Sequence, residues 1–491
     1  MSQPSATTTE TDGALGVLSP SEGKIYALLG VSSKGTTDAP AVYARISDVV
    51  AAYGSGPLVE AAAHYIERYG RPVVLVRTGQ TTVGSATAIT DGVAGTSVVT
   101  RGVAVIPIDD YEFRLKVVSG GTIGTAGITF QWSLDDGRTW SAVTALGTAV
   151  TWTAPADSSP AGSAAPGIKI DFAAGTLLAD DNVTFRSSAP HYNSTELASA
   201  LLALGNSIIA WDLVHVVGIV DATMFDAIDL KAAAFAASGK FRGWIGNTRM
   251  PTISEAEAAY KTALDTIFAS KATVYGMLCS GASKLTSSVS GRKYKRPISF
   301  AVGAREASVS EEVDTADIKL GPFVGVSIRD ANGNVDEHDE SINPGLDDSR
   351  FTVLRTWEGY PGVYVNRPRV FSSPGSDFYL LPHRRVMNLA RAAVRAFLVK
   401  RCSSPILVNK TTGFILETEA LEIESGLRAV LRDELLAKPK ASGTQIAVSR
   451  TDNLLSTKKI TGTARVIPLA YPEYFEFDIG FLNPALQVVT V

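Results

Sequence analysis

The sequence predicts an α/β protein with a mostly parallel sheet core and helices on both faces, an inserted β-sandwich domain, and a C-terminal α+β domain with extended terminal arms. Two observations lead to this class. Strand-like and helix-like segments alternate on both sides of a long stretch that has only β character. Such alternation favours a parallel sheet that helices cover on both faces. The expected domains are an arm at 1–23, the α/β core at 24–81 and 189–349, the β-sandwich at 82–188, the α+β domain at 350–482 and a second arm at 483–491.

Hydrophobic periodicity assigns the elements in chain order. "KIYALLGVS" and "RPVVLVRTG" are typical of buried strands, and "GPLVEAAAHYIERYG" between them has the spacing of a helix. In "EYFEFDIGF", aromatic and aliphatic residues alternate with Glu476, Asp478 and Gly480, which predicts a strand with one buried face. The remaining expectations are strands at 214–220, 241–248, 272–281 and 296–304, and helices at 223–237, 254–270, 382–401 and 418–437.

Length and composition indicate a large protein without a strong net charge. A soft prior of about 150 residues per domain suggests roughly three domains in 491 residues. Lys and Arg number 45 against 49 Asp and Glu, so no overall field attracts nucleic acid or anionic lipid. Cys279 and Cys402 are the two cysteines, which argues for assembly in a reducing cytoplasm. Because neither a signal peptide nor a long apolar run occurs, we expect a chain that is soluble when made and has no direct membrane insertion.

The inserted stretch contains one motif with a known geometry. "SLDDGRTW", residues 133–140, has the Asp-box pattern, in which Asp135 accepts backbone hydrogen bonds, Gly137 takes a positive φ and Trp140 packs beneath the turn. A structural turn is the preferred interpretation, because repeated boxes are absent. Carbohydrate recognition is the alternative.

No pattern in the sequence predicts a catalytic residue, a cofactor or a metal site. "GSG" at 54–56 lacks the Lys-Ser or Lys-Thr pair of a phosphate loop. The calcium-like spacing in 330–340 lacks the glycine and glutamate that an EF-hand needs, so a solvated turn is preferred over an adventitious cation site. None of the histidines precedes a glycine as the histidine motif of a subtilisin-like protease requires; they are His64, His191, His215, His338 and His383.

The order of segments resembles the tail sheath proteins of contractile-tailed bacteriophages and related contractile injection particles. The resemblance is carried by "VVAAYGSGPLVEAAAHYIERYG", "RTWEGYPGVYVNRPRV" and "TGTARVIPLAYPEYFEFDIGF". It implies a structural subunit, not an enzyme, that polymerises as stacked hexameric rings around an inner tail tube protein. The sheath contracts to drive the tube through a bacterial envelope. The implied partners are other copies, the tube, and baseplate and tail terminator proteins, with no direct nucleic acid contact, in a virion tail assembled in the host bacterial cytoplasm.

The C-terminal residues are expected to form an intersubunit arm. A terminal strand without a partner in its own chain completes its backbone hydrogen bonds by joining the sheet edge of another subunit. The alternative is that the strand folds back on its own domain. The expected arm residues are Leu486, Val488, Val489 and Val491.

A basic helix near the C-terminus is the candidate contact with the inner tube. On a helical wheel, Arg384, Arg391 and Arg395 fall on one side, opposite Leu389 and Phe397. The resemblance implies that one face of this domain lines the lumen. A solvated basic face without a partner is the alternative.

Two other functions compete with the sheath interpretation. A carbohydrate-binding surface protein would use the inserted β-domain and its Asp-box segment. An α/β hydrolase would need a polar, cleft-lining group of residues that the sequence does not present.

Overall fold

The computed structural model describes residues 26–156, 162–252, 255–329 and 337–481. Internal contacts divide the chain into a first unit, Met1–Ser403, and a second unit, Ser404–Val491. Helices and several separate sheets make up the described residues, so the prediction of a mixed α/β protein is confirmed. The finer domain limits stay predictions.

The centre of the first unit is a six-stranded sheet. Its strand order is β17-β16-β15-β1-β3-β2, and every pair is parallel except β2 with β3. Leu28 in the middle strand lies between Leu75 of β3 and His215 of β15. The strands are β1 (Tyr26–Gly30), β2 (Ala41–Tyr43), β3 (Val73–Arg77), β15 (Leu213–Ile219), β16 (Gly243–Asn247) and β17 (Gly276–Cys279).

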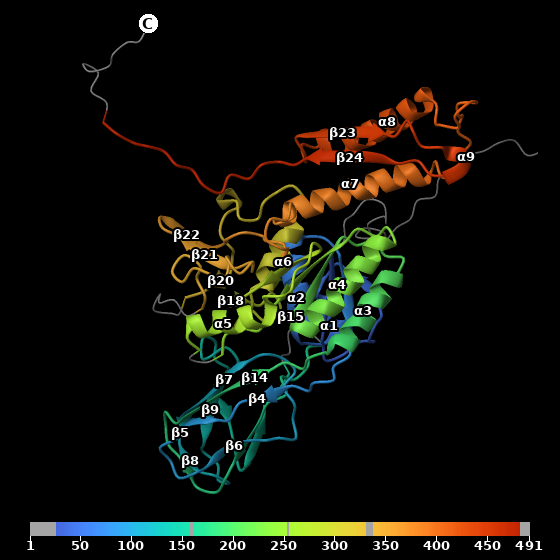
Figure 1. Ribbon diagram of the computed structural model, residues 1–491. Helices are drawn as coiled ribbons and strands as arrows, with labels where there is room; N and C mark the ends of the chain where they lie inside the picture. The colour runs from blue at the N-terminus through green and yellow to red at the C-terminus, as the bar shows by residue number, and fades with distance from the viewer. Residues whose placement is uncertain (1–25, 157–161, 253–254, 330–336, 482–491) are drawn as a thin grey trace, which may run out of the picture. The chain divides into compact units, whose positions relative to one another are not determined.

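Helices cover this sheet on both faces (Figure 1). Alternate strand residues face opposite sides, so Leu28 packs with one group of helices, whereas Ala27 and Leu29 pack with the other. The first group is α1 (Ile46–Tyr53), α2 (Pro57–Tyr69) and α6 (Ser299–Ser308). The second group is α3 (Ser194–Asn206), α4 (Ala222–Ala237) and α5 (Glu257–Phe268).

One predicted strand is wrong. Residues 296–304 were expected to form a strand, but β19 ends at Pro297 and helix α6 occupies Ser299–Ser308. Eight of the ten residues of α6 are buried. A helix that is buried almost all round has no polar stripe, and a short apolar run of this kind does not distinguish a buried helix from a buried strand.

The insertion consists of short strands and extends from one end of the α/β core (Figure 1). Thr82 and His191 close its base, because their backbones exchange hydrogen bonds of 3.0 and 2.8 Å. One sheet has the order β10-β9-β7-β14-β4 with β5 also on β14; a second is β11-β12-β6, and a third is β13-β8. The strands are β4 (Ser85–Ala86), β5 (Thr90–Gly92), β6 (Val99–Arg101), β7 (Glu112–Ser119), β8 (Gly121–Thr122), β9 (Thr129–Ser133), β10 (Thr144–Ala145), β11 (Thr151–Thr153), β12 (Lys169–Phe172), β13 (Thr176–Leu177) and β14 (Asn182–Ser188).

The rest of the first unit follows the central sheet in the chain. A small antiparallel sheet has the order β19-β18-β20, and β21 pairs with β22 as a hairpin. A long helix, α7, then ends the unit. Their bounds are β18 (Ala282–Thr286), β19 (Lys293–Pro297), a 3-10 turn (Ile318–Leu320), β20 (Val326–Ser327), β21 (Leu354–Trp357), β22 (Tyr360–Val365) and α7 (Leu381–Val399).

The second unit is a helix on a two-stranded antiparallel sheet. The backbone N–H of Val448 in β23 donates to Oε1 of Glu424 in α8 at 2.7 Å, which joins the sheet to the helix. In the described part of this unit each strand has one edge that no other strand occupies. The elements are α8 (Glu417–Leu431), a π-helical turn (Arg432–Leu436), β23 (Gly443–Val448), α9 (Leu454–Thr457) and β24 (Gly462–Ile467).

Candidate functional site

The insertion meets the α/β core along a polar seam centred on Arg296 and Asp109. Arg296, in β19, donates from Nη1 and Nη2 to the two carboxylate oxygens of Asp109 at 2.6 and 2.7 Å, and both side chains are 2% exposed. A bidentate pair of this kind is the strong form of a charged hydrogen bond. Burial and the neighbouring Asp109 carboxylate raise the pKa of Asp110 to about 6. The pair therefore joins the insertion to the core by a desolvated contact.

Two more residues of the β19 segment reach into the insertion. Tyr294 is 5% exposed and belongs to the buried cluster of the insertion, where its ring makes an edge contact with Tyr111 at 5.7 Å. The Arg292 guanidinium lies 5.5 Å from the centre of the Trp132 ring. The hydrophobic core of the insertion is thus completed by a strand that lies outside it in sequence.

The Asp-box turn is part of the same seam. Asp135 is fully buried and accepts hydrogen bonds from Ser133 Oγ at 2.7 Å and from the Thr139 backbone N–H at 2.8 Å. The other carboxylate oxygen of Asp135 accepts a hydrogen bond at 3.3 Å from the backbone N–H of Lys293, which belongs to the core. The carboxylate that a sugar would need is therefore enclosed between the turn and β19, and this favours the structural interpretation of the motif.

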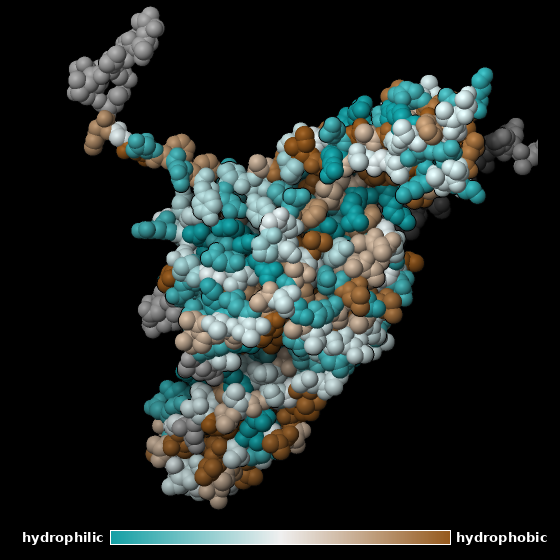
Figure 2. All heavy atoms as spheres, in the orientation of Figure 1, coloured by the Kyte–Doolittle hydropathy of each residue, from teal (hydrophilic) through white to brown (hydrophobic). Residues whose placement is uncertain are grey.

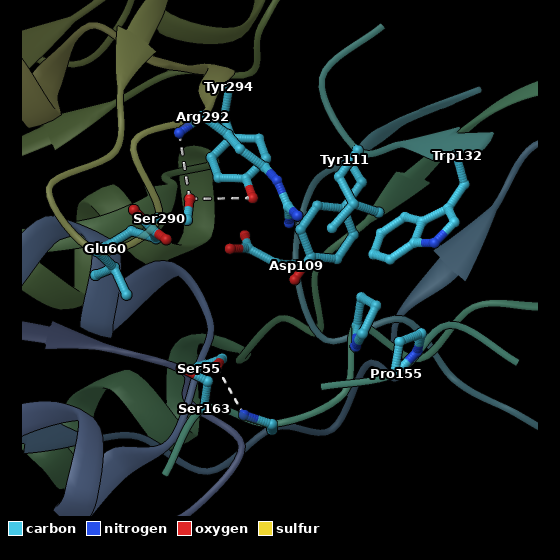
Figure 3. A pocket seen from close by; sticks show the side chains of 14 residues that line it. Ser55, Glu60, Asp109, Tyr111, Trp132, Pro155, Ser163, Ser290, Arg292 and Tyr294 are labelled. Atoms are coloured by element: carbon cyan, nitrogen blue, oxygen red, sulfur yellow. Dashed lines mark hydrogen bonds between the residues drawn. The ribbon is translucent and has the colours of Figure 1, made fainter. Parts of the chain in front are cut away.

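A cavity of about 30 Å³ lies inside the seam (Figure 3). Figure 3 shows Glu60, Asp109, Ser290 and Arg292 around it, from the core and from the insertion. This volume accommodates roughly one or two water molecules; a small-molecule site measures about 300 Å³ or more. The seam is therefore a structural contact and not a ligand site.

A loop of the insertion returns to the core on the far side of this cavity. The Ala164 backbone N–H donates to Ser55 Oγ at 2.9 Å, and Lys34 Nζ donates to the carbonyl of Gly162 at 3.0 Å. Together with the Arg296 pair and the Asp-box turn, this loop gives the insertion three separate attachments to the core.

The three arginines predicted to face a tube are directed at the first unit's own residues. The Arg384 guanidinium lies 5.0 Å from the Tyr275 ring centre, and that of Arg391 lies 4.0 Å from Phe241. A Cβ placed on Gly239 would be 2.0 Å from Nε of Arg395. Arg384 and Arg391 therefore pack on aromatic rings of the first unit, whereas Arg395 lies close to Gly239 and stays exposed.

The expectation of an exposed basic face is wrong for Arg384, which is 3% exposed. Burial and the nearby Arg391 lower its pKa to about 10. Aromatic ring faces attract a guanidinium, which explains why this side of the helix turns toward the core. Arg391 is half-buried and Arg395 is exposed. The contact of these two residues with a tube therefore stays a prediction.

The chain after β24 presents apolar side chains to solvent. Residues 468–481 form no strand, and the exposed fractions are 72% for Phe475, 80% for Phe477 and 90% for Ile479. In Figure 2 hydrophobic and hydrophilic side chains alternate along this segment. The prediction of a strand with one buried face is therefore wrong for the chain by itself, since no described strand pairs with the segment.

Other predicted features can be placed briefly. The arm residues Leu486, Val488, Val489 and Val491 lie outside the described residues, as do 1–25 and the calcium-like loop at 330–336. Cys279 is buried, and burial raises the pKa of its thiol. Among the described residues no three His, Cys, Asp or Glu side chains are placed to hold a metal ion. The helices in the described ranges are all too short or too polar to cross a membrane.

The architecture as a whole is that of contractile sheath proteins. The chain is similar to a protein of the PVC sheath complex of an extracellular contractile injection system in the contracted state, with TM-score 0.53, 9% identity and 99% of both chains covered. It is also similar to the helical sheath of the anti-feeding prophage in its contracted state, with TM-score 0.51, 11% identity, and 98% of this chain and 99% of that chain covered. The resemblance noted in the sequence is thereby confirmed at the level of the fold.

A family profile defines the chain more narrowly. Residues 3–369 match the family described as DUF2586, N-terminal domain, and the chain belongs to this family. No curated protein matches the chain.

Proposed function

We propose that this protein is the subunit of a contractile tail sheath, which polymerises as stacked hexameric rings around an inner tube and contracts to drive the tube through a bacterial envelope. The observation that carries the proposal is the likeness of almost the whole chain, insertion included, to two sheath proteins in their contracted states. In this role the protein has no reaction of its own. Its work comes from repacking of many identical subunits into an arrangement with more favourable contacts.

The second unit supports the proposal with surfaces suited to assembly. Both strands of its sheet have an edge without a described partner, and an exposed sheet edge is a template for a strand from another chain. The arm at 483–491, with Leu486, Val488, Val489 and Val491, is proposed to join such an edge in a neighbouring copy. The inner tube and the baseplate and tail terminator proteins are the further partners, in a tail assembled in the host bacterial cytoplasm.

Electron microscopy of the purified protein tests the proposal directly. We expect tubes or stacked rings from the full chain, and soluble folded subunits when residues 483–491 are deleted, because the lost backbone hydrogen bonds are between subunits. Circular dichroism and a thermal melt of the deleted protein serve as the control for folding. Dispersed single particles from the full chain under all conditions would refute the polymer, and normal tubes from the deletion would refute the role of the arm.

Carbohydrate binding by the insertion is the second candidate. Its sequence support was the Asp-box segment, whose Asp135 carboxylate is enclosed by the turn and by β19. Trp140 remains 37% exposed. Binding to a glycan array that Trp140→Ala abolishes would revive this candidate.

A further inference from the structure

A pocket of about 280 Å³ lies in the first unit where α2, α6 and the segment 320–324 meet. The two helices pack against each other (Figure 1). Small-molecule sites begin at about 300 Å³, so this pocket has room for a compact ligand, unlike the much smaller cavity of the seam. We call it the α2–α6 pocket.

Both helices turn one face toward the α2–α6 pocket. Residues four apart on a helix are neighbours on its surface, and such pairs line the pocket: His64 and Arg68 from α2, and Ala301 and Arg305 from α6. Ala304 lines it as well. Because an alanine side chain ends at Cβ, these positions leave open space beside the guanidinium of Arg305. The pocket therefore combines a positive charge with a small apolar wall.

The segment 320–324 holds the two arginines at the pocket. Arg305 Nη1 donates to the carbonyl of Gly321 at 2.8 Å, and its guanidinium lies 4.1 Å from the centre of the Phe323 ring. Arg68 Nη2 donates to the carbonyl of Val324 at 3.5 Å. Backbone carbonyls and a ring face thus position both guanidiniums, and the positive charges are not neutralised by these contacts.

The positive charge of the α2–α6 pocket has no close counter-charge. None of the residues that line the pocket is acidic. Within the described ranges Arg305 forms no salt bridge, and the nearest approach of Arg68 to Glu67 is 4.0 Å between two partly exposed side chains. Guanidinium groups bind carboxylates through charge-assisted hydrogen bonds, often two at a time. The chemistry of the pocket therefore suits an anion.

A buried histidine gives a second, independent indication of a ligand. His64 lines the pocket and is 4% exposed, and its Nδ1 has no hydrogen-bond partner among the described residues. Burial and the nearby Arg68 lower the pKa of His64 to about 4, so its ring is neutral at pH 7. A neutral imidazole carries one N–H that a carboxylate oxygen can accept. Leaving a buried polar atom unpaired costs free energy that a bound ligand can recover.

We propose that the α2–α6 pocket binds a small monocarboxylate with a compact apolar body. The carboxylate pairs with Arg68 and Arg305, and the apolar body lies against Ala301, Ala304 and Leu320. A doubly charged anion such as phosphate would lose more hydration against these apolar walls without a matching gain. The inference goes beyond the proposed function and does not rest on the assembly of copies.

Equilibrium dialysis of the full chain with radiolabelled benzoate tests the class of ligand. We expect saturable binding at one site per chain. Benzamide, which has the same shape without the charge, and inorganic phosphate should each bind weaker by about tenfold or more, the order expected when a charge-assisted hydrogen bond is lost. Benzoate should also raise the melting temperature, because it binds the folded state. Absence of saturable binding, or equal binding of benzamide or phosphate, would overturn the proposal.

Three variants locate the site. Arg68→Gln should weaken benzoate binding by about tenfold, because one guanidinium is lost. Ser308→Phe should abolish it, since Ser308 is an exposed residue of the pocket lining and a phenyl ring there fills the space. Arg71→Gln is the matched control: it removes an exposed guanidinium just after α2 that does not line the pocket, and it should leave binding unchanged.

Melting temperatures measured without benzoate separate a lost site from a lost fold. If Arg68→Gln lowers the melting temperature, Ser308→Phe decides, because it leaves both guanidiniums in place. Wild-type affinity in a folded Ser308→Phe protein would place benzoate elsewhere and overturn the proposal. Dialysis measures binding whether or not the chain polymerises. A protein that binds benzoate and forms no tubes would therefore refute the sheath alone, and tubes without benzoate binding would refute the pocket alone.

Discussion

Arg296 and Asp109 are 187 residues apart in the sequence and hold each other by two hydrogen bonds of 2.6 and 2.7 Å, with both side chains almost fully buried. The first belongs to β19 of the core and the second precedes β7 of the insertion. Their pairing means that the insertion and the core share one desolvated contact. Separating the insertion from the core would leave the Arg296 guanidinium or the Asp109 carboxylate without its partner.

Breaking this pair on one side should destabilise the first unit strongly. We expect Asp109→Leu to lower the free energy of unfolding by about 3–5 kcal/mol, because it leaves the Arg296 guanidinium buried without its counter-charge. Asp109→Leu with Arg296→Met should cost less than the single change, since the pair is then replaced by apolar groups. Chemical denaturation measures both. Lys116→Ala is the control, because Lys116 pairs with Asp180 in a contact that is about half exposed or more, and it should change the free energy of unfolding by about 1 kcal/mol at most. Equal losses in Asp109→Leu and in the double variant would contradict this account.

Removing the insertion should require repair of the core. Replacing 83–189 by a short Gly/Ser linker is geometrically easy, because Thr82 and His191 already pair. In the native background we expect an aggregation-prone product with a lowered melting temperature, since Arg296 loses Asp109 and Tyr294 loses its cluster. Adding Arg296→Leu and Tyr294→Thr should restore a cooperative melt. An insertion-free chain that is as stable as wild type without these changes would show that the seam contributes nothing.

A buried histidine should make the first unit sensitive to alkaline pH. His338 donates to Glu257 and, at 2.8 Å, to Oε2 of Glu340. Burial disfavours the charged ring, but the hydrogen bonds to Glu257 and Glu340 outweigh it and raise the pKa of His338 to about 9. The folded pKa is above the unfolded one, so the stabilisation is fully present below about pH 6.5 and is lost as pH rises through about 9.

Urea unfolding between pH 6 and pH 10 measures this dependence. We expect wild type to lose about 2 kcal/mol over the alkaline part of the range, a figure reduced for the partial exposure of Glu257. His338→Gln should be less stable near neutrality and should lack that part of the slope. If His338→Gln lost stability with pH as steeply as wild type, the loss of unfolding free energy at alkaline pH would come from other groups.

Substitutions of Arg384 and Arg395 in α7 should differ sharply in their effect on the free energy of unfolding. Arg384→Glu places a carboxylate against ring faces in a buried position, and we expect a loss of about 3 kcal/mol in unfolding free energy. Arg395→Glu alters an exposed residue and should stay within about 0.5 kcal/mol. Thermal melts compare the two.

The tube contact is then tested with the variants that fold. Arg391→Glu with Arg395→Glu should weaken co-sedimentation of the sheath with purified tube, and raised salt should have the same effect because exposed charges are screened. Unchanged binding by the double variant across ionic strength would leave α7 with a structural role only.

Local pattern predicted the main strands of the central sheet and several of its helices, but it gave no helix at α1 or α3. "GPLVEAAAHYIERYG" is α2, and the runs at 214–220, 241–248 and 272–281 contain β15, β16 and β17. The pattern failed at 296–304 because α6 is buried almost all round and so has no helical stripe of polar residues. A local signal of the seam was present in "RKYKRP", where Tyr294 and Arg296 alternate with lysines and therefore share one face of a strand.

The exposure of the candidate surfaces was harder to predict, because it depends on which distant segments of the chain pack against them. The basic side of α7 was identified correctly, but only the folded unit placed Tyr275 and Phe241 opposite Arg384 and Arg391. The Asp-box turn was also identified, whereas its burial against Lys293 follows from a contact 158 residues away.

The sequence by itself therefore determined the alternation of strands and helices along the α/β core and the β character of the insertion, since periodicity and turn residues act within a few positions. The tertiary structure alone decided which faces are covered. Arg296 pairs with Asp109 because the fold brings them together in a desolvated place, and Phe475, Phe477 and Ile479 are exposed because no described strand of the chain pairs with them. Burial is a property of what surrounds a residue, and those neighbours come from distant parts of the chain or from other molecules.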